Sequence, residues 1–184
     1  MFIQTEETPN PNTLKFIPGI QVMSEGTIEF SDKDNALKSN LANLIFSIDG
    51  ISRVFFSSDF ISVTKTENLD WEVLKPMILT SIMDHYASGK EIIEKNEVSD
   101  NLPKEEDTEV VKQIKELIDQ RVRPAVAMDG GDISFCSFED GVVTLQMKGA
   151  CAGCPSSTAT LKMGIENMLR HYIPEVVEVK AAEL

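Results

Sequence analysis

Two cysteines separated by two small residues, Cys151 and Cys154, are the side chains best suited to chemistry. A thiolate binds metal ions and attacks electrophiles, whereas a protonated thiol does neither well. Ala152 and Gly153 let the intervening loop curl so that both sulfur atoms face one point. Pro155 suits a first helical position, so Cys154 should lie at a helix start, where partial positive charge favours the thiolate. The pair is predicted to bind a metal centre or to exchange disulfides.

Three kinds of site use such a pair. An iron–sulfur cluster takes four protein ligands, usually cysteines, and this chain holds three cysteines in all. Two chains that each give Cys151 and Cys154 to one cluster on a twofold axis would complete the set, in an exposed site built from loops. Structural zinc also takes four ligands, and the C-terminal half adds only His171. Thiol–disulfide exchange needs no dimer, but the βαβ pattern that usually accompanies it is absent here.

Other candidate ligands are better explained by structural roles. Cys136 falls in a predicted strand, on the opposite face of the sheet from Ile133 and Phe135. It is interpreted as a small, partly buried side chain rather than a ligand. His85 and His171 each fall near a predicted helix C-terminus, where a cation is favourable. The Asp-Gly-Gly-Asp run at residues 129–132 is interpreted as a turn, because one short acidic turn cannot fill a calcium shell.

Composition limits the class of protein. The chain has 184 residues, of which 42% are hydrophobic and 26% charged, as in an ordinary globular protein. Its net charge of −13 argues against nucleic-acid binding, which needs clustered basic residues. No apolar run is long enough to span a bilayer, so no membrane association is expected. The few cysteines favour a reducing compartment, and we expect a cytoplasmic protein or, if the chain is a processed form, one of the mitochondrial matrix.

A charged strip divides the chain into two predicted domains. Residues 89–107 hold three basic and seven acidic side chains, which is typical of a mobile linker. Residues 1–88 form the first domain, which contains no cysteine and is predicted to recognise partners or clients. Residues 108–184 form the second domain, which carries Cys151 and Cys154.

The first domain has a mixed pattern. Strands are predicted at residues 13–17, 27–30, 53–57 and 60–66, with a hairpin turn at Ser58-Asp59. A helical stripe joins Leu37, Leu41, Leu44 and Ile45, and a second helix with Leu74, Ile78 and Ile82 should run from Asp70 to Gly89.

The second domain shows the order α-β-β-α-β. A helix with the stripe Val110, Ile114, Leu117 and Ile118 should end near Arg123-Pro124. Asp140-Gly141 predicts a hairpin whose returning strand buries Val143, Leu145 and Met147. The next helix carries Leu161, Ile165, Met168 and Leu169, and a strand is predicted at residues 176–179. The fold class is therefore α+β, with two small domains and, in the second, helices on one face of a small sheet.

The chain resembles a known family at several of these motifs. The C-terminal half resembles the domain of NifU-like proteins, and the N-terminal start resembles the first domain of their Nfu-type members. The matching runs are Arg-Pro-Ala-Val at 123–126, Asp-Gly-Gly-Asp-Ile at 129–133, Met-Lys-Gly-Ala-Cys-Ala-Gly-Cys-Pro-Ser-Ser at 147–157, and Thr-Pro-Asn-Pro-Asn-Thr-Leu-Lys-Phe at 8–16.

This resemblance implies a scaffold or carrier for iron–sulfur clusters rather than an enzyme. The implied cofactor is a [4Fe–4S] cluster, with [2Fe–2S] as the alternative, held between two protomers by Cys151 and Cys154. The implied partners are a second copy of the chain, upstream cluster donors and apo-proteins that receive the cluster. Cys136 has no counterpart in the family's motif. The alternatives from the residues alone, a thiol–disulfide oxidoreductase and a structural zinc module, use the same cysteine pair.

Overall fold

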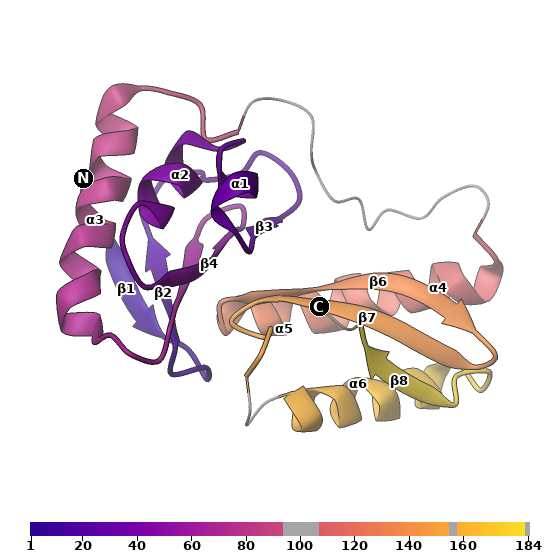
Figure 1. Ribbon diagram of the computed structural model, residues 1–184. Coiled ribbons are helices and arrows are strands. Elements are labelled where there is room, and N and C mark those ends of the chain that lie inside the picture. Colours follow the sequence, from indigo (N-terminus) through magenta and orange to yellow (C-terminus); the bar gives the residue numbers. More distant parts are fainter. Residues whose placement is uncertain (94–106, 155–157, 183–184) are drawn as a thin grey trace. The chain divides into compact units, whose positions relative to one another are not determined.

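A computed structural model describes residues 1–93, 107–154 and 158–182 of the chain (Figure 1). The chain forms two compact units, Met1–Ser99 and Asp100–Leu184, and each combines helices with a β-sheet. The predicted α+β class with two domains is therefore confirmed. Within the described ranges, no helix is both long and apolar enough to cross a membrane.

The N-terminal unit is built on a five-stranded antiparallel sheet with the order β1-β2-β5-β4-β3. Its elements are β1 (Gln4–Glu7), β2 (Thr13–Ile17), β3 (Ile28–Phe30), α1 (Lys33–Ala36), α2 (Asn40–Phe46), β4 (Ile51–Phe56), β5 (Ile61–Lys65) and α3 (Trp71–Ser88). The predicted hairpin is present, because β4 and β5 pair antiparallel and the amide of Ser57 donates to the carbonyl of Phe60.

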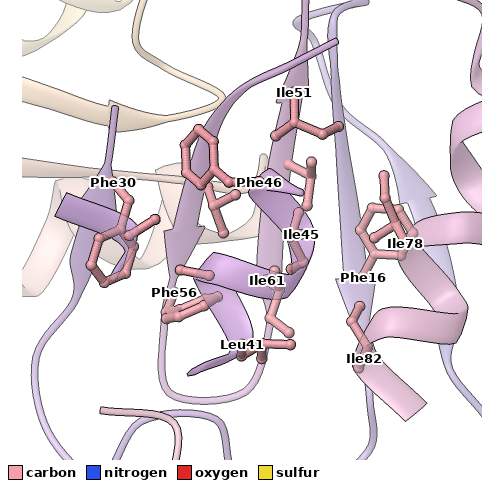
Figure 2. Packing of buried hydrophobic residues seen from close by; sticks show 14 of the residues in the cluster. Phe16, Phe30, Leu41, Ile45, Phe46, Ile51, Phe56, Ile61, Ile78 and Ile82 are labelled. Atoms are coloured by element: carbon pink, nitrogen blue, oxygen red, sulfur yellow. The ribbon is translucent and has the colours of Figure 1, made fainter. Parts of the chain in front are cut away.

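The core of this unit lies between the sheet and the helices α2 and α3 (Figure 2). Aromatic and branched side chains of the strands meet those of the two helices there, and all of them are buried. Those labelled in the figure are Phe16, Phe30, Ile51, Phe56 and Ile61 from the strands, Leu41, Ile45 and Phe46 from α2, and Ile78 and Ile82 from α3.

Two features of the N-terminal unit differ from the predictions. Strand β1 was not predicted, because its sequence is polar and it forms by pairing with β2 at the sheet edge. The helical stripe that begins at Leu37 is interrupted, and Leu37 is 69% exposed. The side chain of Ser39 accepts a hydrogen bond from the amide of Ala42 and starts α2 anew. Leu37 therefore falls in the connection between α1 and α2.

Helix α3 follows its prediction. It starts after Asp70 and ends at Gly89, which adopts the left-handed conformation typical of a helix C-terminus. Beyond it, Ile92 and Ile93 pack partly against the core of the N-terminal unit, although they fall in the predicted linker. The hydroxyl of Ser39 donates to the carbonyl of Ile92 over 2.6 Å. Residues 94–106 of the predicted linker lie outside the described residues.

The C-terminal unit has a three-stranded sheet with the order β6-β7-β8. Strands β6 and β7 form an antiparallel hairpin, and β8 joins β7 in parallel. Its elements are α4 (Glu109–Leu117), the π-helical segment η1 (Ile118–Val122), α5 (Arg123–Met128), β6 (Gly131–Glu139), β7 (Val142–Gly149), α6 (Thr158–Tyr172) and β8 (Glu178–Ala181).

One apolar cluster joins the helices of this unit to its sheet. Val143, Leu145 and Met147 are buried in it, as the alternation along β7 predicted. Ile165 and Leu169 of α6 are buried in the same cluster as Ile114 of α4. Asp140 and Gly141 both have positive φ, 50° and 79°, as the predicted two-residue hairpin turn requires.

The first helix of the C-terminal unit does not end at Pro124, contrary to the prediction. Proline lacks an amide hydrogen and clashes with the carbonyl four residues earlier in an ordinary α-helix. Here the wider π-helical turn η1 precedes Arg123, and Pro124 falls in the first turn of α5, where a missing donor has no cost. The helical path therefore continues to Met128 and reaches the start of β6.

Candidate metal-binding site

The cysteine pair lies in the loop that follows β7. Figure 1 shows β7 and α6, the elements between which this loop runs. Gly149 and Gly153 adopt positive φ values of 62° and 70°, which only glycine adopts readily. The amide of Ala152 donates to the carbonyl of Gly149 over 3.2 Å, and the amide of Ala150 donates to the carbonyl of Gly130 over 3.1 Å. The loop is therefore tightly turned and tied to the segment that leads into β6.

Cys154 stands where the chain turns into α6. Its carbonyl oxygen accepts hydrogen bonds from both the amide and the hydroxyl of Thr158, over 3.4 and 2.6 Å. The hydrogen bond from the Thr158 amide joins residues four positions apart. Helix α6 begins at Thr158, and residues 155–157, where the sequence predicts the helix start, lie outside the described residues.

Both thiols are buried, which contradicts the predicted exposed site. Cys151 is 5% exposed and Cys154 is 1% exposed. Cys151 belongs to the apolar cluster of the C-terminal unit, with Ile133 and Met147 among its other members. The loop folds back onto the start of β6, so neither sulfur projects into solvent as a free loop would allow. The two cysteines do not form a disulfide with each other.

Gly131 lies directly against Cys151. A Cβ atom built on Gly131 would overlap Sγ of Cys151, and would lie 2.9 Å from the carbonyl oxygen of Lys148 and 3.0 Å from the amide of Cys151. Gly131 also pairs with Gly149 in the β6–β7 register. The sequence predicts a turn at Gly131 but not its contact with the sulfur.

An ion pair fixes the residue that follows Gly131. Arg123 donates from Nε and Nη2 to the two carboxylate oxygens of Asp132, over 2.8 and 3.1 Å, and from Nη1 to Asp119 over 2.8 Å. Asp132 is buried. The hydrogen bond to its carboxylate raises the pKa of Arg123 above its ordinary value. Sequence reasoning missed this pair, because its partners lie nine positions apart on different elements.

The remaining candidates belong to elements other than the cysteine loop. Cys136 is exposed, not partly buried as predicted; it lies at a β-bulge between Phe135 and Ser137, on the sheet face away from the apolar cluster that includes Ile133. Partial desolvation nevertheless raises the pKa of its thiol. His85 is buried in the N-terminal unit and burial lowers its pKa, so the predicted role of a helix-capping cation is wrong. His171 is exposed near the end of α6 and contacts the ring of Tyr172.

The chemistry of the site follows from its donors. Cys151 and Cys154 offer two sulfur ligands on one loop. Among residues 1–93, 107–154 and 158–182, no group of three or more His, Cys, Asp or Glu side chains is placed to hold a metal ion. Two thiols suit soft metals and iron–sulfur clusters, and they also suit reversible disulfide formation.

These features define a two-domain α+β protein with a paired-thiol loop between a β-hairpin and a helix. Two family models match the chain. "Scaffold protein Nfu/NifU N terminal" matches residues 3–89, and "NifU-like domain" matches residues 114–180. The chain belongs to the Nfu/NifU family, which confirms the resemblance seen in the sequence.

Curated relatives match almost the whole chain. "NFU1 iron-sulfur cluster scaffold homolog, mitochondrial" from Homo sapiens is 52% identical over 181 residues, which cover 98% of this chain and 71% of the relative. "NifU-like protein 4, mitochondrial" from Arabidopsis thaliana is 51% identical over 185 residues. The match covers 98% of this chain but 65% of that relative, which is less than two thirds.

Among solved structures, that of a NifU-like protein from Saccharomyces cerevisiae is 29% identical to the chain. The match covers 52% of this chain and 87% of that one, with a TM-score of 0.47.

Proposed function

We propose that this chain is a scaffold and carrier for iron–sulfur clusters, and not an enzyme. The single observation that carries the proposal is the pair of reduced thiols, Cys151 and Cys154, on one glycine-bounded loop in a member of this family. The name of the human relative, an iron–sulfur cluster scaffold homolog, supports it. The cluster is the cargo of this protein rather than a resident catalytic group.

The proposed ligand set is shared by two chains. A [4Fe–4S] cluster takes four protein ligands, and each chain supplies Cys151 and Cys154. A homodimer about a twofold axis brings two such pairs to one cluster. A [2Fe–2S] cluster with the same four ligands is the alternative, and upstream donors would supply either form.

Transfer to an apo-protein would proceed by exchange of thiolates. A thiolate of the receiving protein forms a bond to iron as the bond from iron to Cys151 or Cys154 breaks, so no electron leaves the cluster. Repetition at the other ligands moves the intact cluster to the client. The leaving thiolates stay in the loop and take up protons from solvent.

Anaerobic reconstitution with ferrous iron, sulfide and a thiol tests the proposal. About four irons per dimer with broad visible absorption would support a shared [4Fe–4S] cluster. Two irons per dimer would support the [2Fe–2S] alternative. A monomer that binds zinc stably and takes up no chromophore would contradict the proposal.

Single cysteine substitutions locate the ligands. Cys151→Ser and Cys154→Ser should each abolish the bound cluster, because each removes two of the four ligands from the dimer. Cys136→Ser is the matched control, since Cys136 is exposed on β6 and outside the loop, and it should load like the wild type. Loss of the cluster in the control variant alone would place the site elsewhere.

A thiol–disulfide oxidoreductase is the competing function for the same pair. It requires a reversible disulfide between Cys151 and Cys154 and turnover in an insulin-reduction assay by a monomer. The proposed carrier should show no such turnover while it binds a cluster as a dimer.

The N-terminal unit is proposed to recognise clients or partners. It carries a fold of its own and no cysteine. Deleting residues 1–88 should leave cluster binding intact and slow transfer to apo-proteins. Unchanged transfer to every client tested would contradict this role.

Because both relatives named above are described as mitochondrial, we propose the mitochondrial matrix as its location, rather than the cytoplasm that the sequence favours.

A further inference from the structure

The burial of Cys151 does not fit a thiol that waits to bond a shared cluster. At 5% exposure its sulfur is covered by its own chain, and the apolar cluster of the C-terminal unit includes it. A thiol covered in this way is not available to bond iron at an interface with a second chain. If Cys151 is a cluster ligand, as proposed above, the loop holds it differently when the cluster is bound.

The space that the sulfur occupies exists because residue 131 has no side chain. A Cβ on residue 131 would overlap Sγ of Cys151, and two backbone atoms lie close to the same position. These are the carbonyl oxygen of Lys148 and the amide nitrogen of Cys151, 2.9 and 3.0 Å from that Cβ position. We call this space, bounded by Gly131 and by these two backbone atoms, the Gly131 seat. Any larger residue at position 131 would fill it.

The seat is fixed from both of its strands. On β6, Asp132 directly after Gly131 is held by the two hydrogen bonds from Arg123. On β7, Gly149 pairs with Gly131, and the amide of Ala150 donates to the carbonyl of Gly130. The Gly131 side of this space is therefore held in place by the hydrogen bonds of the β6–β7 hairpin.

We propose that Gly131 is a positioning residue whose seat stores the Cys151 thiol inside the C-terminal unit while no cluster is bound. Storage keeps the thiol away from oxidants and stray metal ions. The thiol must leave the seat before it can bond to iron at an interface with a second chain. This role in cargo handling rests on the proposed function, whereas the storage itself does not.

Alkylation of the reduced, metal-free full-length chain tests the seat. Brief pulses of iodoacetamide are followed by trypsin and mass spectrometry, with fragmentation of the peptide spanning residues 149–162 to separate Cys151 from Cys154. In the wild type, Cys151 should react at least about 30-fold more slowly than in urea, because reaction requires local opening. Exposed Cys136 is the internal reference and should change by less than about threefold.

Gly131→Ala should raise the rate at Cys151 by about tenfold or more, because the added methyl group occupies the seat. The rate at Cys136 should not change, and the rate at Cys154 should change much less than that at Cys151. Gly164→Ala is the matched control, because Gly164 lies in α6 with nothing within 4 Å of an added Cβ. It should react like the wild type at all three cysteines.

Two results would overturn the seat. One is a Cys151 that reacts with iodoacetamide in the folded wild type as fast as in urea. This result would refute the proposed storage even if Gly131→Ala fails to fold. The other is a folded Gly131→Ala chain in which Cys151 stays slow, or in which Cys151 and Cys154 accelerate equally, as a general loosening of the loop would produce. The alkylation test uses metal-free protein and therefore does not depend on cluster binding. A chain that protects Cys151 but never takes up iron would contradict only the proposed function.

Discussion

Arg123 shows how much one side chain contributes around the cysteine loop. It joins Asp119 of the helical segment to Asp132 of the hairpin with three hydrogen bonds. Asp132 is buried, so its charge must be compensated within the protein. A guanidinium does this well, because its planar fork matches both oxygens of a carboxylate.

Arg123→Met should lower the free energy of unfolding of the C-terminal unit by about 2 kcal/mol. The methionine retains much of the apolar stem but leaves the buried carboxylate without this partner. Urea unfolding by circular dichroism measures the change. Arg170→Met is the control, since Arg170 is more than half exposed and its ion pair with Glu166 spans 3.8 Å. Its effect should stay below about 0.5 kcal/mol, and equal effects would refute a special role for Arg123.

His85 makes the N-terminal unit sensitive to acid. Both its ring nitrogens are buried without a hydrogen-bond partner among the described residues. Burial, and secondarily the charge of Lys90, lowers the pKa of His85 below its ordinary value of 6.5. The unfolded chain therefore binds a proton below about pH 6.5 that the folded unit does not bind, so stability falls as the pH falls below this value.

Stability of the N-terminal unit should thus decrease from about pH 7 to about pH 5.5 and should be flat with respect to His85 above pH 7. Fluorescence of Trp71 reports this unit alone, because it is the single tryptophan of the chain. His85→Phe keeps an aromatic ring and removes the titration, so it should flatten the dependence. An equally steep dependence in this variant would assign the effect to other groups.

Short turns and wide helical turns decide the geometry of the C-terminal unit at the level of elements. The turn at Asp140-Gly141 aligns β6 with β7, and the carbonyl of Gly141 also accepts hydrogen bonds from Val177 and Glu178 at the start of β8. The segment η1 lets the helical path pass Pro124 and deliver Arg123 to Asp132. The Asp140-Gly141 turn and the segment η1 thus set the contacts of β6, the strand that carries Gly131.

Gly141→Ala should destabilise the C-terminal unit by about 2 kcal/mol. It combines a strained positive φ with close approaches of the new Cβ to Val177 Cγ2, 2.7 Å, and to the carbonyl of Glu175, 3.0 Å. Gly19→Ala is the matched control, because Gly19 has a similar φ of 74° but nothing within 4 Å of the new Cβ. Thermal unfolding of both variants separates the two costs. If Gly141→Ala loses no more stability than Gly19→Ala, the contacts of the new Cβ with Val177 and Glu175 do not contribute to the destabilisation.

The whole molecule consists of two units with separate apolar cores. The core of the N-terminal unit includes residues from α1, α2 and α3, and that of the C-terminal unit includes the ligand candidate Cys151. Each core buries its own helices against its own sheet. Each unit therefore has the main requirement for folding alone.

The two units should unfold independently. Arg123→Met should shift the transition seen by circular dichroism for the C-terminal unit while the Trp71 fluorescence transition stays at the same urea concentration. A parallel shift of both transitions would show that the units are coupled. The same independence underlies the expectation that the chain without residues 1–88 still takes up a cluster.

Local signals in the sequence located many of the elements. The Asp140-Gly141 turn, the alternation of Val143, Leu145 and Met147, and the stop at Gly89 were predicted, and each depends on neighbouring residues alone. Predictions failed where contacts distant in the sequence decide the structure: β1 forms by pairing with β2 at the sheet edge, and the thiols of the cysteine loop are buried by the start of β6. Pro124 was misjudged because a preceding π-helical turn was not foreseen.

The sequence by itself determined that two cysteines three positions apart follow a β-hairpin, in a chain with too few other thiols to complete a cluster site. Residue type and spacing are enough for that, because they define donors and local loop geometry. Only the tertiary structure decided that both thiols are buried and that Cys151 rests on Gly131. Burial depends on which strand lies beneath the loop, and the β6–β7 register brings Gly131 there from twenty residues away.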